Sequence, residues 1–174
     1  MALMPIIVAP DPRLKIKARP VKRVDAGVRQ LMDDMLESMY AADGIGLAAP
    51  QVGDDRRVIV VDIAKEGEEP EPLMMANPEF VDLADDDRQH EEGCLSLPEH
   101  FAEVTRPDWV QVRYLDHTNA VRTLEADGVL ATCVQHEMDH LDGILFVDHI
   151  SAIKRNMILR KLTKAKKQAA QAVG

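Results

Sequence analysis

Two histidines four residues apart, His136 and His140, are the side chains of this 174-residue sequence best placed to do chemistry together. On a helix, this spacing puts both imidazoles on one face, with Cβ atoms about 5–6 Å apart, close enough to share a metal ion. Glu137 lies between them, where a carboxylate can accept a proton from a water molecule that the metal activates. The segment therefore predicts a helix that carries a catalytic metal centre.

The third ligand of this metal must come from outside the helix. The pattern HExxH is typical of zinc hydrolases, and one large group completes it with a third His at the position that Phe146 occupies here. Another group uses a Glu from a later helix, but no Glu follows Glu137. Cys94 is the favoured candidate, because a thiolate is a good ligand for a divalent first-row metal. Asp148 and His149, which follow the helix closely, remain alternatives.

The two cysteines are expected to have different roles. Gly93 directly before Cys94 permits close approach or unusual backbone angles, so Cys94 is expected on a shaped loop or at a strand end. Cys133 lies on the helix three residues before His136, but its distance from His140 along the axis is about 10.5 Å. A short side chain cannot span that distance and share a metal, so Cys133 is interpreted as part of a pocket wall.

A third segment, Asp43–Gln51, is rich in glycine and alanine. It lacks the Gly-Lys-Ser/Thr of a phosphate-binding loop, and its small residues let a backbone approach a ligand closely. Gly44 is expected to cap the end of a preceding helix, with a tight turn after it. The amide of Gln51 could donate to an oxyanion beside the metal, although by itself it would be an ordinary surface residue.

Together, the three segments resemble the peptide deformylase family, which carries the motifs GxGLAAxQ, EGCLS and QHExDHLxG in that order. The chain reads GIGLAAPQ at Gly44–Gln51, EGCLS at Glu92–Ser96 and QHEMDHLDG at Gln135–Gly143. The N-terminal stretches 9–14 and 18–21 are similar to that family as well. The resemblance therefore extends over nearly the whole chain.

This resemblance implies removal of the formyl group from the N-terminal formyl-methionine of newly made polypeptides. It also implies one divalent metal ion, natively iron(II), which zinc, nickel or cobalt can replace. By this resemblance, Cys94, His136 and His140 would bind the metal, and Glu137 would act as the acid–base catalyst. Gln51 and the Leu95 backbone N–H would stabilise the oxyanion, and the Gly46 backbone would hydrogen-bond the substrate. The methionine side chain would bind in a pocket on or near Ile45, Glu92, Leu95 and Cys133.

One position departs from the family pattern. Many bacterial members have an Arg after the cysteine motif that reaches the substrate backbone beyond the methionine. Here Phe101 stands at that place. The departure concerns the outer substrate-binding site and leaves the residues of the expected metal centre unchanged.

The periodicity of the chain predicts an α+β fold, with mixed or antiparallel sheets packed around a central helix that bears HExxH. Asp25 is expected to cap an N-terminal helix that ends near Ala42. A C-terminal helix is expected at about 151–170, with its apolar stripe formed by Ile153, Met157, Ile158 and Leu162. The expected strands are 57–63, 73–76, 79–83, 109–115, 120–125 and 145–147.

Residues 1–174 are expected to form one domain. The side chains of His90, His100 and His117, which lie in polar segments, are expected to face solvent.

The charge of the chain is uneven. Its formal net charge is −9, yet seven Lys and Arg residues and no acidic residue follow from Lys154 onward. The simpler interpretation is a solvent-exposed helix whose basic residues complement the negative, C-terminal end of its own dipole. The alternative is a partner contact, and since the implied substrate emerges from a ribosome, we consider a ribosome contact through this helix.

Two cysteines are too few for a disulfide framework and suit a reducing compartment. The first residues lack the basic start and apolar run of a signal peptide, and no apolar stretch is long enough to span a membrane. We therefore expect a cytoplasmic protein with no membrane association and no direct DNA binding.

Overall fold

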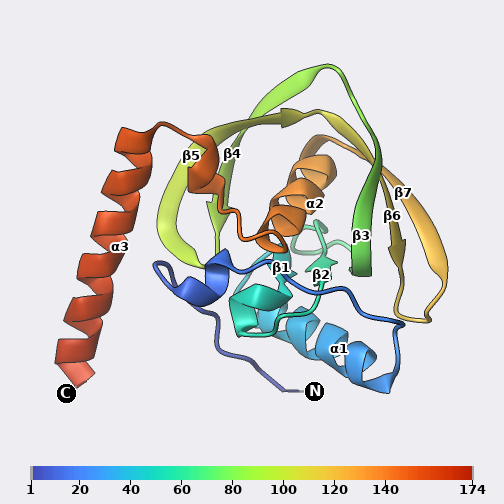
Figure 1. Ribbon diagram of the computed structural model, residues 1–174, viewed down its shortest axis with the longest axis horizontal. Helices are drawn as coiled ribbons and strands as arrows, with labels where there is room; N and C mark the ends of the chain where they lie inside the picture. The colour runs from blue at the N-terminus through green and yellow to red at the C-terminus, as the bar shows by residue number, and fades with distance from the viewer. Residues whose placement is uncertain (1, 174) are drawn as a thin grey trace.

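The computed structural model describes residues 2–173 and has the expected α+β architecture, with α2 between the two sheets (Figure 1). A five-stranded antiparallel sheet has the order β1-β2-β3-β6-β7, and β4 and β5 form a separate two-stranded sheet. The strands are β1 (Gly46–Ala48), β2 (Val58–Val61), β3 (Leu73–Leu83), β4 (Asp87–Cys94), β5 (Leu97–Pro107), β6 (Trp109–Leu115) and β7 (Val121–Asp127). The helices are α1 (Ala26–Ala41), α2 (Gly128–His140) and α3 (Ala152–Val173), with 3-10 turns η1 (Pro12–Lys15), η2 (Ala49–Val52) and η3 (Phe146–His149).

Helix α1 begins where its sequence predicts, because the Asp25 side chain accepts a hydrogen bond from the backbone N–H of Val28 at 3.0 Å. Its end differs from the prediction. The residue in the left-handed conformation is Asp43, with φ of 56°, and not Gly44. Glycine is needed at position 44 for a different reason, because a Cβ there would lie 2.6 Å from Cδ1 of Leu95. The glycine thus permits close packing, while an Asp tolerates the left-handed turn.

Helix α2 is buried on nearly every side, and its apolar residues join one core cluster with the inner faces of β2, β3 and β6. The helix ends at His140, and Gly143 follows in the left-handed conformation with φ of 74°. A Cβ at Gly143 would lie 2.6 Å from the carbonyl oxygen of Lys15, so only glycine fits. The predicted end of the motif helix near Gly143 is therefore confirmed.

The large sheet supports α2 from one side. Val110, Val112 and Tyr114 alternate along β6 and are buried, as the period-2 pattern predicts. The prediction of two short strands around Asn77-Pro78 was wrong, because β3 runs through both. Its register with β6 shifts at this dipeptide, where proline cannot donate a ladder hydrogen bond and the chain bulges instead of turning.

The hairpin of β4 and β5 was not predicted, although it carries Cys94. Its sequence is dominated by charged and polar residues in β4, which reads DRQHEEGC. Sequence alternation fails here because much of the hairpin is exposed and one of its few buried side chains, Glu92, is charged. Figure 1 places this hairpin on the side of α2 opposite to β3, β6 and β7.

The segment after α2 forms the 3-10 turn η3, so the prediction of a strand at 145–147 was wrong. The carboxylate of Asp148 accepts a hydrogen bond from the backbone N–H of Leu145 at 2.9 Å and closes the turn. This local hydrogen bond competes with the extended conformation that the apolar residues suggest.

Only half of the predicted apolar stripe of α3 is buried. Ile158 and Leu162 pack into the core cluster that also holds Leu14 and Phe146, whereas Ile153 is 82% exposed. The helix lies along the outside of the molecule (Figure 1), and Leu159 packs beside Ile158 and Leu162 against the same cluster. Lys166 adds to this attachment, since its Nζ donates to the carbonyl oxygens of Val8 and Pro10 at 2.6 and 2.9 Å.

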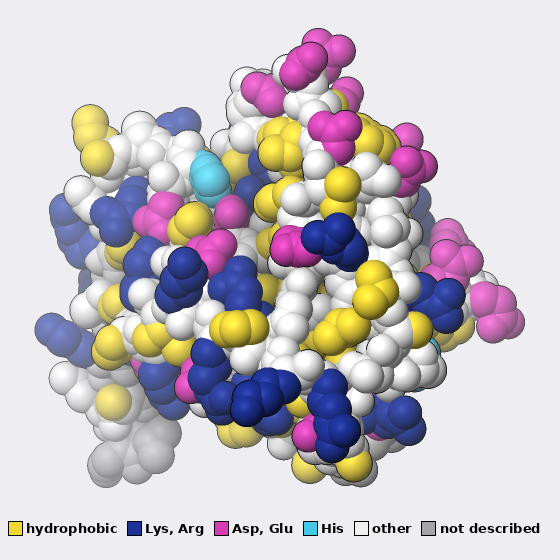
Figure 2. All heavy atoms as spheres, turned by 45° about the vertical axis from the view of Figure 1, so that its right-hand side comes forward, with side chains coloured by type: hydrophobic (Ala, Val, Ile, Leu, Met, Phe, Trp, Pro, Cys, Tyr) yellow, Lys and Arg dark blue, Asp and Glu magenta, His cyan; other side chains and the backbone are white. Residues whose placement is uncertain are grey.

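The surface charge follows the sequence. Lys and Arg side chains gather at the left of Figure 2, where α3 lies, and also along the bottom of this face, while Asp and Glu side chains are prominent at the top and right. Among the described residues, no helix is long and apolar enough to cross a membrane.

Candidate active site

Three potential metal ligands from two distant segments meet at the floor of a cavity. One donor atom each from Cys94, His136 and His140 lie within 4.8 Å of one another. Sγ of Cys94 is 3.4 Å from Nε2 of His140, and the two imidazole centroids are 5.1 Å apart. No other such group occurs in the part of the chain that the structure describes. The cysteine favoured by the sequence is therefore the one beside the two histidines.

The alternative third ligands are engaged elsewhere. Asp148 accepts hydrogen bonds from Nζ of Lys15 at 2.7 Å and from Nε of Arg155 at 2.9 Å. Nε2 of His149 lies 2.8 Å from a carboxylate oxygen of Asp139. Both side chains therefore tie η3 to neighbouring elements and do not take part in the three-donor cluster.

Cys94 reaches the site because it ends β4, where the register with β5 shifts between Gly93 and Cys94. A Cβ at Gly93 would lie 2.5 Å from the ring of Phe101, so glycine is needed for this close packing. The sulfur faces two donors, the backbone N–H of Ser96 and Nε2 of Gln51, each at 3.4 Å. These two contacts hold the sulfur in place beside the histidines.

A buried carboxylate orients one of the histidines. Oε1 of Glu92 lies 2.9 Å from Nδ1 of His136, and Arg106 donates to both oxygens of Glu92 at 2.6 and 3.0 Å. Burial alone would raise the pKa of Glu92, but its hydrogen bonds to His136 and Arg106 lower it to about 2. An ionised Glu92 accepts a hydrogen bond from Nδ1–H of His136, which leaves Nε2 of His136 free to bind a metal.

Arg106 extends this arrangement to the surface. Its Nη1 donates to Asp139 at 2.8 Å, and Asp139 in turn contacts His149. Residues of β4, β5, α2 and η3 are thus joined by one chain of polar contacts. Because the carboxylate of Glu92 is occupied by His136 and Arg106, its contribution to a methionine pocket is confined to the rest of the side chain.

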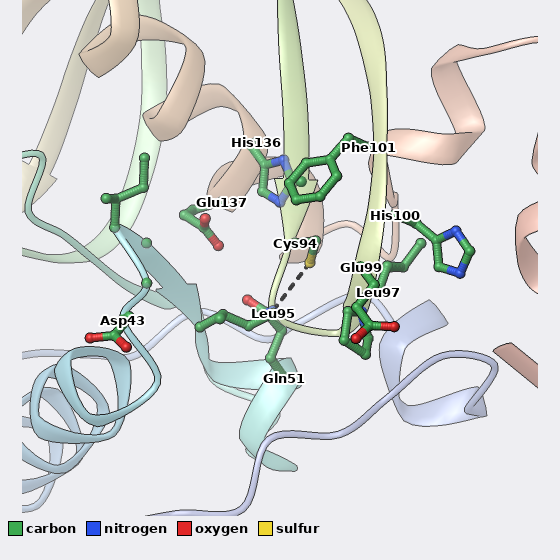
Figure 3. A pocket seen from close by; sticks show the side chains of 15 residues that line it. Asp43, Gln51, Cys94, Leu95, Leu97, Glu99, His100, Phe101, His136 and Glu137 are labelled. Carbon is green, nitrogen blue, oxygen red and sulfur yellow. Dashed lines mark hydrogen bonds between the residues drawn. The ribbon is translucent and has the colours of Figure 1, made fainter. Parts of the chain in front are cut away.

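Gln51 is 1% exposed and belongs to η2, so it is not an ordinary surface residue. Its Oε1 accepts a hydrogen bond from the backbone N–H of Ala48 at 2.9 Å, which fixes the orientation of the amide. Its Nε2 donates to Oγ of Ser96 at 3.0 Å and to Sγ of Cys94 at 3.4 Å. The amide N–H groups therefore face the proposed ligand sulfur, as Figure 3 shows.

Glu137 is buried next to the three ligands, and Oε1 of this side chain has no hydrogen-bond partner among the described residues. Burial raises the pKa of Glu137 to about 7, although the nearby His136 acts in the opposite direction. Gly46 makes room for this carboxylate, because a Cβ there would collide with Oε2 of Glu137 and lie 2.9 Å from Sγ of Cys133. A carboxyl group with this pKa can both take up and release a proton near neutral pH.

Cys94 and His136 line a cavity of about 460 Å³, and His140 is fully buried beside them. One wall is the segment from Asp43 to Gly46, another is the start of β5, and Glu137 and His136 close the floor (Figure 3). Leu95 lines it beside Cys94, and Phe101, which is 62% exposed, stands at its edge. The cavity is large enough for part of an extended peptide.

Comparison with known proteins fits these observations. The family model described as Polypeptide deformylase matches residues 3–156. A peptide deformylase of Methylocella silvestris is 55% identical over 174 residues, covering 98% of this chain and 89% of the relative. That of Agrobacterium fabrum is 52% identical over 165 residues, covering 95% and 97%. The chain belongs to the polypeptide deformylase family.

Solved structures of the deformylase family agree with the fold. The crystal structure of peptide deformylase from Ehrlichia chaffeensis superposes with a TM-score of 0.92 at 36% identity, covering 97% of this chain and 99% of that one. The same enzyme in complex with actinonin gives a TM-score of 0.90 at 39% identity, covering 95% and 98%. The α+β prediction is therefore confirmed.

The donor atoms of this deformylase site fit a divalent metal ion. One thiolate sulfur and two imidazole nitrogens are donors that several first-row metals accept. Glu92 holds Nδ1 of His136, and the unpartnered Oε1 of Glu137 lies beside the same donors. Three protein ligands with a free carboxylate alongside match an open catalytic site and not a closed structural one.

Two further residues of the deformylase site were missed by sequence reasoning. His100 lines the main cavity, and His90 lines a smaller pocket behind Ile45 and Cys133. Both were expected to face solvent, but both are only half-exposed. They alternate along the β4–β5 hairpin with exposed residues, so recognising these strands would have been the signal that places them toward the site. His117 is exposed, as predicted.

Proposed function

We propose that this chain hydrolyses the formyl group from the N-terminal formyl-methionine of newly made polypeptides and releases formate. The proposal rests mainly on one observation, the cluster of Cys94, His136 and His140 beside the unpartnered carboxylate of Glu137. Membership of the deformylase family supports the same reaction.

We propose iron(II) as the native metal, held by Cys94, His136 and His140, with zinc, nickel or cobalt as possible substitutes. The iron assignment rests on the family resemblance, since the same donor set accepts several divalent ions. When bound, such an ion would supply Lewis acidity for water activation and for polarisation of the formyl carbonyl.

The protein residues provide proton transfer and positioning in this proposal. Glu137, with a pKa of about 7, takes the proton from the attacking water and returns it to the leaving amine. The amide of Gln51 and the backbone N–H of Leu95 donate to the oxygen on which negative charge develops. Losing one such donor typically lowers turnover by about 10²–10³-fold.

Substrate binding is assigned to the two cavity walls. The backbone of Gly46 hydrogen-bonds the peptide, and Ile45, Leu95, Cys133 and the stem of Glu92 surround the methionine side chain. Phe101 at the cavity edge would contact the following residues through its ring, where it cannot hydrogen-bond a backbone. This arrangement favours an extended substrate that enters with its formylated end first.

The test is formate release from the peptide formyl-Met-Ala-Ser by anaerobically purified protein with its metal content measured. We expect turnover in the native protein and a loss of at least about 10³-fold in Glu137→Ala, since the proton acceptor is gone. The metal content of Glu137→Ala should match that of the native protein. A near-normal rate in this variant, or no formate from metal-loaded native protein, would contradict the proposal.

We also propose that α3 contacts the ribosome and that the protein acts in the cytoplasm on nascent chains. Exposed Lys154, Lys161, Lys164 and Lys167 support a contact with an anionic partner, and the free thiols suit a reducing compartment. Co-sedimentation with ribosomes should fall when these four lysines are changed to Gln, and should weaken with salt. Unchanged sedimentation would remove the idea.

A further inference from the structure

A small pocket of about 80 Å³ adjoins the main cavity behind Glu137. Part of its wall is apolar, formed by Ile45, Val129 and Cys133. It is far smaller than the main cavity of about 460 Å³, so it suits one side chain and not a stretch of peptide. Under the proposed function, this pocket receives the side chain of the first residue of the substrate.

The rest of the pocket wall includes two polar side chains, Thr132 and His90, that make no hydrogen bond to other described residues. Thr132 on α2 is 8% exposed, and its hydroxyl makes no hydrogen bond to any described residue, not even to the preceding turn of the helix. His90 on β4 is half-buried, and its ring likewise has no hydrogen-bond partner within residues 2–173. Neither group is among the buried polar atoms that lack a partner in the described residues, so both are accessible from the pocket and can donate to a ligand there.

The other polar side chains nearby are engaged or exposed to solvent, apart from the carboxylate of Glu137, which is assigned to proton transfer in the proposed reaction. Gln135, on the same helix, donates to the carbonyl oxygens of Pro107 and Ala131 at 2.9 and 3.1 Å. Glu92 is held by Arg106, and Glu91 is exposed to solvent. Besides the carboxylate of Glu137, the groups of this pocket that remain able to hydrogen-bond a ligand are the Thr132 hydroxyl and the His90 ring.

The thioether of methionine would leave these donors without a strong partner, because its sulfur is only a weak acceptor. Oxidation of methionine to the sulfoxide adds one oxygen, which is a strong acceptor, to the same sulfur. We propose that the pocket also accepts methionine sulfoxide, with the Thr132 hydroxyl and a His90 ring N–H donating to the sulfoxide oxygen. Formylated peptides that begin with oxidised methionine are then a second substrate class, an inference that rests on the proposed function.

The test compares kcat/KM for formate release from formyl-Met-Ala-Ser and from its sulfoxide, with the two sulfoxide epimers measured separately. A pocket without donors typically rejects an added polar group by about 10²-fold. We expect the better sulfoxide epimer to react within about 10-fold of the unoxidised peptide. A ratio of sulfoxide to thioether below about 1/100 for both epimers in native protein would overturn the inference.

Substitutions in the pocket test whether Thr132 and His90 are the groups that bind the sulfoxide oxygen. Thr132→Val and His90→Leu should each lower the ratio of sulfoxide to thioether kcat/KM by about 10-fold, while Thr132→Ser, which keeps the hydroxyl, should restore it. The same changes at exposed positions, Thr105→Val and His117→Leu, should leave the ratio as in native protein. An unchanged ratio in both pocket variants would refute the assigned donors.

The outcomes separate this inference from the function on which it rests. Formate from the unoxidised peptide but not from either sulfoxide would sink the second substrate class alone. Formate from neither peptide, with metal bound, would sink the deformylase proposal and the inference together. If Thr132→Val or His90→Leu loses activity on both peptides, the inference is tested with Thr132→Ser instead. In that variant the ratio of sulfoxide to thioether kcat/KM must equal the ratio in native protein.

Discussion

At the scale of single residues, the sulfur of Cys94 shows why one cysteine rather than the other is the proposed ligand. It faces two N–H donors and lies beside Nε2 of His140. Cys133 instead lies 3.6 Å from the carbonyl oxygen of Ile45, and burial raises the pKa of its thiol well above the usual value. A neutral buried thiol packs as a small apolar group and does not bind metal.

We therefore expect Cys94→Ser to lower metal retention by about 10-fold or more, because serine replaces a soft thiolate by a weak neutral donor. Cys133→Ser should retain its metal nearly as well as native protein. The measurement is metal content after dialysis against a weak chelator, followed over time. If Cys133→Ser lost its metal and Cys94→Ser kept it, the ligand assignment would be reversed.

At the scale of elements, the ion pair of Arg106 and Glu92 links β5 to β4, and the contact of Arg106 with Asp139 links both strands to α2. The hairpin that carries Cys94 is thus fixed to the helix that carries His136 by buried charges as well as by apolar packing. Removing one member of such a group leaves the other charge buried without compensation.

We expect Arg106→Leu to lower the free energy of unfolding by about 3–5 kcal/mol, measured by urea denaturation. Arg113→Leu is the matched control, since Arg113 forms an exposed pair with Glu79 whose loss should cost less than about 1 kcal/mol. Equal losses in the two variants would show that the buried pair does not hold the hairpin and helix together.

The turn between β6 and β7 has an electrostatic anchor of its own. Asp116 accepts hydrogen bonds from the backbone N–H groups of Thr118 and Ala120 and from Nε of Arg122. Burial alone would raise the pKa of Asp116, but a hydrogen bond from the Thr118 hydroxyl at 2.7 Å, together with those from Arg122 and the two backbone N–H groups, lowers it. A lowered pKa means that the stabilisation is complete above the unfolded-state value of about 3.9 and is lost as the pH falls below it.

Native protein should therefore exceed Asp116→Asn in free energy of unfolding by about 1–2 kcal/mol at pH 7, and this difference should shrink below about pH 4. Urea denaturation of both proteins from pH 7 down to pH 3 measures it. A difference that stays constant over this range would mean that the ionised carboxylate is not the stabilising group.

At the scale of the whole molecule, the proposed metal ties together regions that are far apart in sequence. The end of β4 supplies one ligand and α2 supplies two, so a bound ion joins the small sheet to the central helix. An ion that binds only the folded state stabilises it in proportion to its affinity.

Chelation should therefore lower the free energy of unfolding, by about 3–4 kcal/mol when the free metal had been at 100–1,000 times its Kd. Differential scanning calorimetry of metal-loaded and metal-free protein measures this, with Cys94→Ser as the comparison in which the difference should be much smaller. Equal transition temperatures for loaded and metal-free native protein would mean that the ion does not bridge these elements.

Local features of the molecule were predictable from the sequence because they depend on neighbouring residues. Helical geometry alone puts His136 and His140 on one face, and a short Asp side chain before an apolar stripe predicts the start of α1 at Asp25. Alternation predicts the buried face of β6. The deformylase motifs also pointed to Cys94, though residue chemistry by itself left Asp148 and His149 open.

The tertiary structure decided everything that depends on contacts between distant segments. It selected Cys94 as the neighbour of the histidines, buried the amide of Gln51 beside its sulfur, and paired Glu92 with Arg106. It also turned His90 toward the side pocket, on a hairpin whose polar sequence hides its strands. The physical reason is that spacing along a chain fixes geometry only within one helix or strand, while the partners of a buried charge or a metal ligand are set by how the elements pack.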